Sequence, residues 1–262
     1  GNTVIKGIAQ ELVDAMTELG ACSPHTWCPN HNSVTIMDEE VFKVVALDKC
    51  IKAGVEILLY TQVIDTNVEN GELQSVTLFG KGRKMELEAD VFIDATGDGA
   101  ICANAGVPMQ EKGDQPMQPA SLIFCLGGVD TDNLSVAHHN LQGVNMHHEP
   151  LQKALRELAK TEEIPQFGGP WFCHIMHDGF VLVNATRTFA DMSNHLDATA
   201  AECKLREDAY VLTDYFRKLD PVFKDCYLAY TAPICGTRET RHIKGVHVLT
   251  GEEYVNRVHF ED

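Results

Sequence analysis

Cysteine and histidine occur at every third residue in one loop near the start of the chain: Cys22, His25, Cys28 and His31. Thiolates and imidazoles are the ligands that zinc prefers in proteins. The spacing nevertheless differs from the C-x-x-C and H-x₃₋₅-H pairs of ordinary zinc sites. We therefore expect no metal site, and a metal-binding module built on these four residues is kept as an alternative function.

A glycine-rich turn, Thr96-Gly97-Asp98-Gly99, is the second place where residue types point to chemistry. It follows an apolar segment over 90–95 and leads into a short helix that ends near Gly106. Glycines let a ligand approach the backbone, and a helix N-terminus offers N–H groups to anions. Asp98 can also accept hydrogen bonds from ribose or ribityl hydroxyls. The pattern predicts a nucleotide-binding turn, and the alternative is an ordinary turn in which Asp98 caps the helix.

Several histidines in the second half of the chain have side chains that could act as acids or bases. They are His138, His139, His147, His148, His174 and His177. No carboxylate forms a tight motif with them, so we expect them to be exposed to solvent. The sequence contains neither a G-x-S-x-G elbow nor a Walker loop, so it gives no support to a hydrolase or a P-loop enzyme.

Apolar periodicity and turn residues define the elements of the N-terminal part. Asp38 is expected to cap a helix over 39–53, and Asn70-Gly71 is a hairpin signal. The expected elements are helices over 4–19 and 39–53, strands over 55–60, 85–89 and 90–95, and a turn at 80–82.

The second part changes character after a Pro-, Gln- and Met-rich stretch at 107–119, which we interpret as a linker. The expected elements are strands over 120–128, 180–185 and 226–234 and helices over 149–161 and 197–219. The helix over 197–219 carries an apolar stripe that is typical of core packing. The fold class is therefore mixed α/β, with two lobes over residues 1–110 and 111–262.

Composition narrows the classes of function. The 262 residues include 21 Lys and Arg against 38 Asp and Glu, a formal net charge of −17. Such a charge argues against nucleic-acid binding, and no apolar stretch is long enough to span a membrane. The 9 cysteines are odd in number and scattered, as reduced thiols are, so we expect a cytoplasmic protein.

Four stretches together resemble a known family. They are GIAQELVDAMTELGA at 7–21 (from Gly7), DVFIDATGDGAICANAGVP at 90–108, VNATR at 183–187 and GTRETRHIKGVHVLTGEEY at 236–254. The chain resembles FAD-dependent oxidoreductases, the glutathione-reductase-like and fumarate-reductase-like flavoproteins. The resemblance implies a partial, Rossmann-like FAD-binding lobe over 1–110 and a substrate lobe of mixed sheet and helices over 111–262.

Two departures from this family stand out. The family opens with a G-x-G-x-x-G strand–turn–helix that seats the FAD pyrophosphate, and this sequence has none. It also lacks the family's C-terminal segment that closes over the flavin. We therefore expect the chain to be the central fragment of a longer enzyme, with FAD bound by the parent protein.

The resemblance implies roles for individual residues. The positions matched to FAD contacts are Val63, Ala95, Thr96, Gly97 and Asp98. Arg238 and Arg241 match paired arginines of the substrate lobe and imply a small, carboxylate-bearing substrate. The function implied is hydride or electron transfer between that substrate and the flavin. Two alternatives stay open: a non-catalytic α/β domain, and an internal ion-pair network that joins Arg238, Glu239 and Arg241.

Overall fold

The computed structural model describes residues 6–28, 32–110, 117–134 and 146–260. The chain divides into two compact units, and each is made of two separate segments. Unit 1 comprises residues 1–57 and 118–238, and unit 2 comprises residues 58–117 and 239–262. These units do not follow the expected boundary near residue 110, because residues 1–57 group with the C-terminal half. The assignment of FAD to 1–110 and of substrate to 111–262 stays a prediction.

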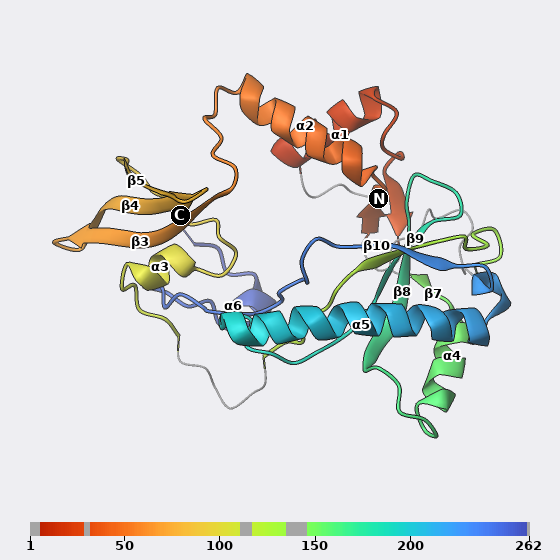
Figure 1. Cartoon of the computed structure of the whole chain (residues 1–262). Helices are drawn as coiled ribbons and strands as arrows, with labels where there is room; N and C mark the ends of the chain where they lie inside the picture. The colour runs from red at the N-terminus through yellow and green to blue at the C-terminus, as the bar shows by residue number, and fades with distance from the viewer. Residues whose placement is uncertain (1–5, 29–31, 111–116, 135–145, 261–262) are drawn as a thin grey trace. The chain divides into compact units, whose positions relative to one another are not determined.

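A five-stranded antiparallel sheet forms the centre of unit 1, with the strand order β10-β6-β9-β8-β7. Its strands are β6 (Phe124–Gly127), β7 (Met146–His147), β8 (Phe167–His174), β9 (Val181–Thr186) and β10 (Tyr227–Thr231). The long helix α5 (His195–Leu219) contacts β9 and β10, and α4 (Glu149–Leu158) contacts α5 (Figure 1). The 3₁₀ turn η1 (Pro221–Phe223) follows α5.

Phe216, near the end of α5, lies at the centre of the core of unit 1. Its ring centroid is 6.5 Å from that of Phe124, 6.2 Å from that of Phe172 and 5.6 Å from that of Phe223. All four side chains are fully buried. The same face of α5 buries Leu212, so the predicted apolar stripe packs into the core, as expected.

The N-terminal part of unit 1 contains two helices and a small hairpin. They are α1 (Ile8–Glu18), β1 (Thr26–Cys28), β2 (Asn32–Val34) and α2 (Glu39–Lys52). Asp38 caps α2 as predicted, since its Oδ1 accepts from the backbone N–H of Glu40 at 3.0 Å and of Val41 at 3.1 Å. The hydroxyl of Tyr230 donates to Glu39, which ties α2 to β10.

Unit 2 is built on a three-stranded antiparallel sheet, with the order β3-β4-β5. Its elements are β3 (Thr61–Glu69), β4 (Glu72–Gly80), β5 (Arg83–Glu88), α3 (Ala100–Asn104) and α6 (Gly251–Asn256). The predicted Asn70-Gly71 hairpin is confirmed, with φ of 53° and 84° at the two turn residues. Helix α3 contacts β3 within this unit.

The mixed class of helices and sheets is confirmed, but two expected strands are wrong. Residues 55–60 and 90–95 form no strand, and Tyr60, Val91 and Ile93 are 80%, 76% and 85% exposed. A strand needs a neighbour that completes its backbone hydrogen bonds, and no described strand pairs with either segment. The sequence also missed β7, β8 and the small β1–β2 hairpin.

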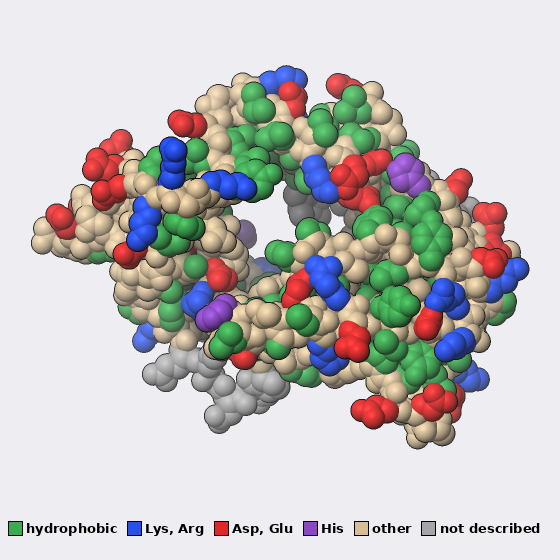
Figure 2. Space-filling view, in the orientation of Figure 1, with side chains coloured by type: hydrophobic (Ala, Val, Ile, Leu, Met, Phe, Trp, Pro, Cys, Tyr) green, Lys and Arg blue, Asp and Glu red, His purple; other side chains and the backbone are tan. Residues whose placement is uncertain are grey.

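The surface agrees with the acidic composition. Lys and Arg side chains lie interspersed with Asp and Glu on the face shown in Figure 2, which therefore presents no continuous basic surface. Among the described residues, no helix is both long and apolar enough to cross a membrane. The eight cysteines with described side chains are free thiols.

The core of unit 1 predicts the result of one pair of substitutions. Phe216→Ala should lower the free energy of unfolding by about 3–5 kcal/mol, because it removes a ring packed against three others. Tyr210→Ala, on the same helix at a position 63% exposed, should change it by less than about 0.5 kcal/mol. Urea titration measures both. Equal losses in the two variants would contradict the placement of the core.

Candidate functional site

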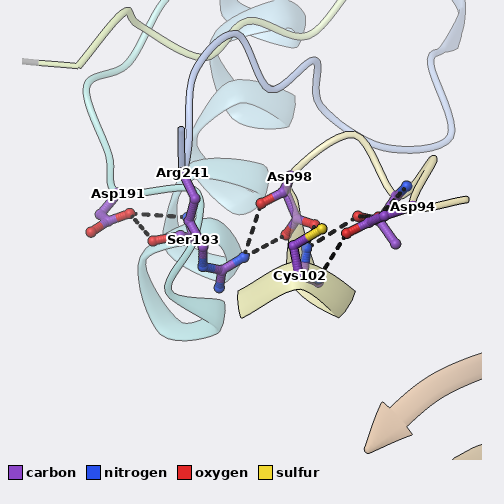
Figure 3. A network of polar contacts seen from close by, with 8 residues as sticks. Asp94, Asp98, Cys102, Asp191, Ser193 and Arg241 are labelled. Atoms are coloured by element: carbon purple, nitrogen blue, oxygen red, sulfur yellow. Dashed lines mark hydrogen bonds and ion pairs between the residues drawn. The ribbon is translucent and has the colours of Figure 1, made fainter. Parts of the chain in front are cut away.

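The Asp94 carboxylate organises the glycine-rich turn. Its Oδ1 accepts from the Thr96 backbone N–H at 3.1 Å and from the Thr96 hydroxyl at 2.7 Å. Its Oδ2 accepts from the Cys102 backbone N–H in α3 at 3.0 Å. One side chain therefore fixes both the start of the turn and the first turn of the helix after it (Figure 3).

These contacts change the acidity of both side chains. Burial raises the pKa of the Asp94 carboxyl, but the hydrogen bonds from Thr96 and Cys102 outweigh it and lower the pKa to about 2. Burial, followed by the hydrogen bond to Asp94 and its charge, raises the pKa of the Cys102 thiol. At neutral pH, Asp94 is therefore a carboxylate and Cys102 a thiol.

Asp98 lies in the same turn and links it to the C-terminal segment of unit 2. Its Oδ1 accepts from the Ala100 N–H at 3.1 Å, so Asp98 does cap the start of α3. Its Oδ2 lies 3.0 Å from Arg241 Nη1, which also donates to the Asp98 carbonyl at 3.3 Å (Figure 3). The two side chains are about one-third exposed, at 33% for Asp98 and 29% for Arg241.

The backbone of the turn is open at Gly97. Gly97 has a φ of 84°, a conformation that L-residues with a side chain rarely adopt, and a Cβ placed there would meet no atom within 4 Å. A ligand can therefore approach the backbone at this point.

The donor set of the turn fits hydroxyl groups and does not fit a pyrophosphate. Helix α3 has five residues, and Asp98 and Asp94 already accept from the N–H groups of Ala100 and Cys102. Two carboxylates at this helix start repel a phosphate. Asp98, in contrast, keeps acceptor capacity beyond its two contacts, because a carboxylate offers about four lone-pair sites.

The five residues predicted to contact the cofactor, Val63 and 95–98, all belong to unit 2. Val63 lies in β3, where it pairs with Leu78, and the register shifts directly after it. Since α3 contacts β3, the structure brings the two predicted segments into one neighbourhood. Their contacts with a cofactor stay a prediction.

The two predicted substrate arginines fall in different units, because the division lies between Arg238 and Glu239. Arg238 is exposed. Arg241 pairs with Asp98 and Glu239 lies 3.3 Å from His242. The ion-pair network that would join Arg238, Glu239 and Arg241 stays a prediction. Their role toward a substrate stays a prediction.

The Cys22–His31 loop is described only in part, since His31 and the side chain of Cys28 lie outside the described residues. Burial raises the pKa of the Cys22 thiol, opposed by a hydrogen bond with Thr17. The His25 ring contacts Thr35 Oγ1 at 2.5 Å and Gln10 Oε1 at 3.1 Å. Within the described part of the chain, no three His, Cys, Asp or Glu side chains gather as metal ligands would.

The histidines of the second half differ in their surroundings. His138, His139 and the side chain of His147 lie outside the described residues. The exposure expected for His148 is wrong, because its buried ring lies 2.9 Å from the Asp220 carboxylate. Burial lowers the pKa of His174, and His177 is 63% exposed beside Asp38. No local signal marks the His148–Asp220 pair, whose members are 72 positions apart.

A family profile described as FAD dependent oxidoreductase matches residues 1–262 of the chain. A comparison with curated protein sequences finds no match.

The solved structures that are similar to the chain include a brominase and a dehydrogenase. The flavin-dependent brominase Bmp2 shares 14% identity over 84% of this chain and 52% of its own, with a TM-score of 0.50. The L-proline dehydrogenase from P. horikoshii shares 18% identity over 82% of this chain and 46% of its own, with a TM-score of 0.39. The brominase supports a likeness of fold only. The chain spans about half the length of the structures it matches.

The Asp94 contacts predict a pH-dependent stability of the turn. Asp94→Asn should speed hydrogen exchange of the Cys102 amide by about ten-fold or more near neutral pH, because a charge-assisted hydrogen bond is lost. The native pKa of about 2 is depressed, so the stabilisation is complete above the unfolded pKa and is lost as the pH falls toward 2. The difference in Cys102 amide exchange rate between the wild type and Asp94→Asn should therefore shrink below about pH 4.

Asp90→Asn is the matched control, since Asp90 is an exposed aspartate close by in the sequence. It should leave the Cys102 amide unchanged. An Asp94→Asn effect that is constant from neutral to acidic pH would contradict a role of the ionised carboxylate.

Proposed function

We propose, because this chain belongs to the family of FAD dependent oxidoreductases, that it forms part of an enzyme that transfers a hydride or electrons between FAD and a small organic substrate. The observation that carries the proposal is the family match over residues 1–262. The activity of the whole protein belongs to the proposal, since the chain covers about half of the solved structures it resembles.

The turn over 96–99 is the part of the chain that we assign to the cofactor. Asp98 accepts hydrogen bonds from ribose or ribityl hydroxyls of the cofactor. Gly97 has no side chain, so this part of the cofactor can approach the backbone. Arg241 holds the Asp98 carboxylate in place at 3.0 Å and offsets its charge. FAD, when bound, supplies the redox chemistry, and the protein supplies binding and orientation.

The substrate in this proposal is a small organic molecule that carries a carboxylate. Arg241 already pairs with Asp98, so Arg238, which is exposed, is the better candidate of the two for a substrate contact. A cytoplasmic location is also part of the proposal, and the free thiols of the described cysteines support it.

Asp98→Ala tests the assignment of the turn. The substitution should weaken FAD binding by roughly ten-fold to a hundred-fold, the usual effect of removing one hydrogen bond to a charged group. The purified parent enzyme that contains this chain is titrated with FAD, and bound flavin is measured by its visible absorbance and fluorescence. Asp90→Ala, at an exposed position outside the turn, should bind FAD like the wild type.

Circular dichroism checks that each variant is folded. A wild-type parent enzyme that binds no FAD would contradict the proposed function. FAD binding of equal affinity in Asp98→Ala and wild type would contradict the role of the turn and leave the flavin proposal standing.

A further inference from the structure

The regular pairing of strand β8 with β9 in unit 1 is interrupted by a bulge. Phe167 pairs with Thr186 and Trp171 with Asn184, so three residues of β8 lie opposite the single residue Ala185. These three residues are Gly168, Gly169 and Pro170. Bulges of this kind interrupt the regular pairing of strands and often redirect side chains at functional sites.

The side chain of Arg187, the residue after β9, lies against this bulge. Its guanidinium lies over the Trp171 ring, 5.3 Å from the ring centroid. It also lies directly against the backbone of Gly168, where a Cβ would overlap the guanidinium nitrogens. The absence of a side chain at Gly168 is therefore what allows the guanidinium to occupy this position.

The bulge itself is held from a separate element. The side-chain amide of Gln152 in α4 donates to the Gly169 carbonyl at 2.6 Å. The guanidinium thus rests on an aromatic ring and on a backbone segment that is fixed by its own hydrogen bond. Because the Arg187 side chain is already held in position, binding of an anion costs little side-chain entropy.

Arg187 has no acidic partner in the part of the chain that the structure describes. Other arginines of unit 1 pair with nearby carboxylates, Arg206 with Glu202 and Arg217 with Asp214. Across the described residues, neither an ion pair nor a hydrogen bond to a protein acceptor involves the Arg187 guanidinium, although it is partly buried. A guanidinium presents five N–H donors, and a partly buried one is stabilised by an acceptor.

We propose that Arg187, stacked on Trp171 above the Gly168–Pro170 bulge, is a binding site for the carboxylate group of a small molecule. The planar edge of a guanidinium matches a carboxylate with two parallel hydrogen bonds. Neither Trp171 nor the Gly168–Pro170 segment adds a second positive charge, so the site balances one negative charge. A phosphate dianion would need a further cation, and the acidic surface of the chain disfavours it.

Benzoate tests this site, and benzyl alcohol serves as its neutral analogue. Trp27→Phe leaves Trp171 as the only tryptophan, because the chain has two. In this background, benzoate should bind with one-to-one stoichiometry and change the Trp171 fluorescence, and calorimetry should give the same affinity. Arg187→Gln should weaken binding by about ten-fold or more, as expected for the loss of a charge-assisted pair.

Two further variants separate position from charge. Gly168→Ala keeps the charge of Arg187 but displaces its guanidinium, and it should weaken benzoate binding to a similar degree. Arg156→Gln, at an exposed arginine of α4 in the same unit, should bind like the wild type. Circular dichroism checks the fold of each variant, and Arg187→Gln alone carries the test if Gly168→Ala does not fold.

Three results would overturn the proposal: unchanged benzoate affinity in Arg187→Gln, benzyl alcohol binding as tightly as benzoate, or inorganic phosphate binding more tightly than benzoate at this site. The experiment uses no flavin readout, so its outcome is independent of the proposed redox function.

Discussion

The candidate site depends on one interaction, the acceptance of three hydrogen bonds by the Asp94 carboxylate. Because Asp94 binds Thr96 and Cys102 together, the chain turns sharply between them and presents Gly97 and Asp98. Arg241 then holds Asp98 from a segment distant in the sequence. These same contacts occupy the start of α3, which is why the turn suits hydroxyl groups and not a phosphate.

The two units use different interactions to hold their candidate functional residues. In unit 1, the buried rings around Phe216 fix α5 against the sheet, and the sheet supports the bulge below Arg187. In unit 2, charged hydrogen bonds hold the turn, and Val76 and Leu78 of the sheet are buried.

Local signals in the sequence predicted much of this fold. The Asp38 cap, the Asn70-Gly71 hairpin and the stripe of α5 each depend on residues close together in the chain, and all three are confirmed. Prediction failed where the structure of a segment depends on residues far away in the sequence. The segments 55–60 and 90–95 are apolar, but no described strand pairs with them. The Arg241–Asp98 pair joins positions 143 residues apart, so spacing alone indicated the turn but not its partner.

We propose that the 96–99 turn binds hydroxyl groups of FAD through Asp98. The most direct measurement is a crystal structure of the protein with FAD. We expect an Asp98 carboxylate oxygen within about 2.5–3.0 Å of a ribose or ribityl hydroxyl, with Asp94 still bound to the Cys102 N–H. A pyrophosphate seated on the first N–H groups of α3, with Asp94 displaced, would contradict it.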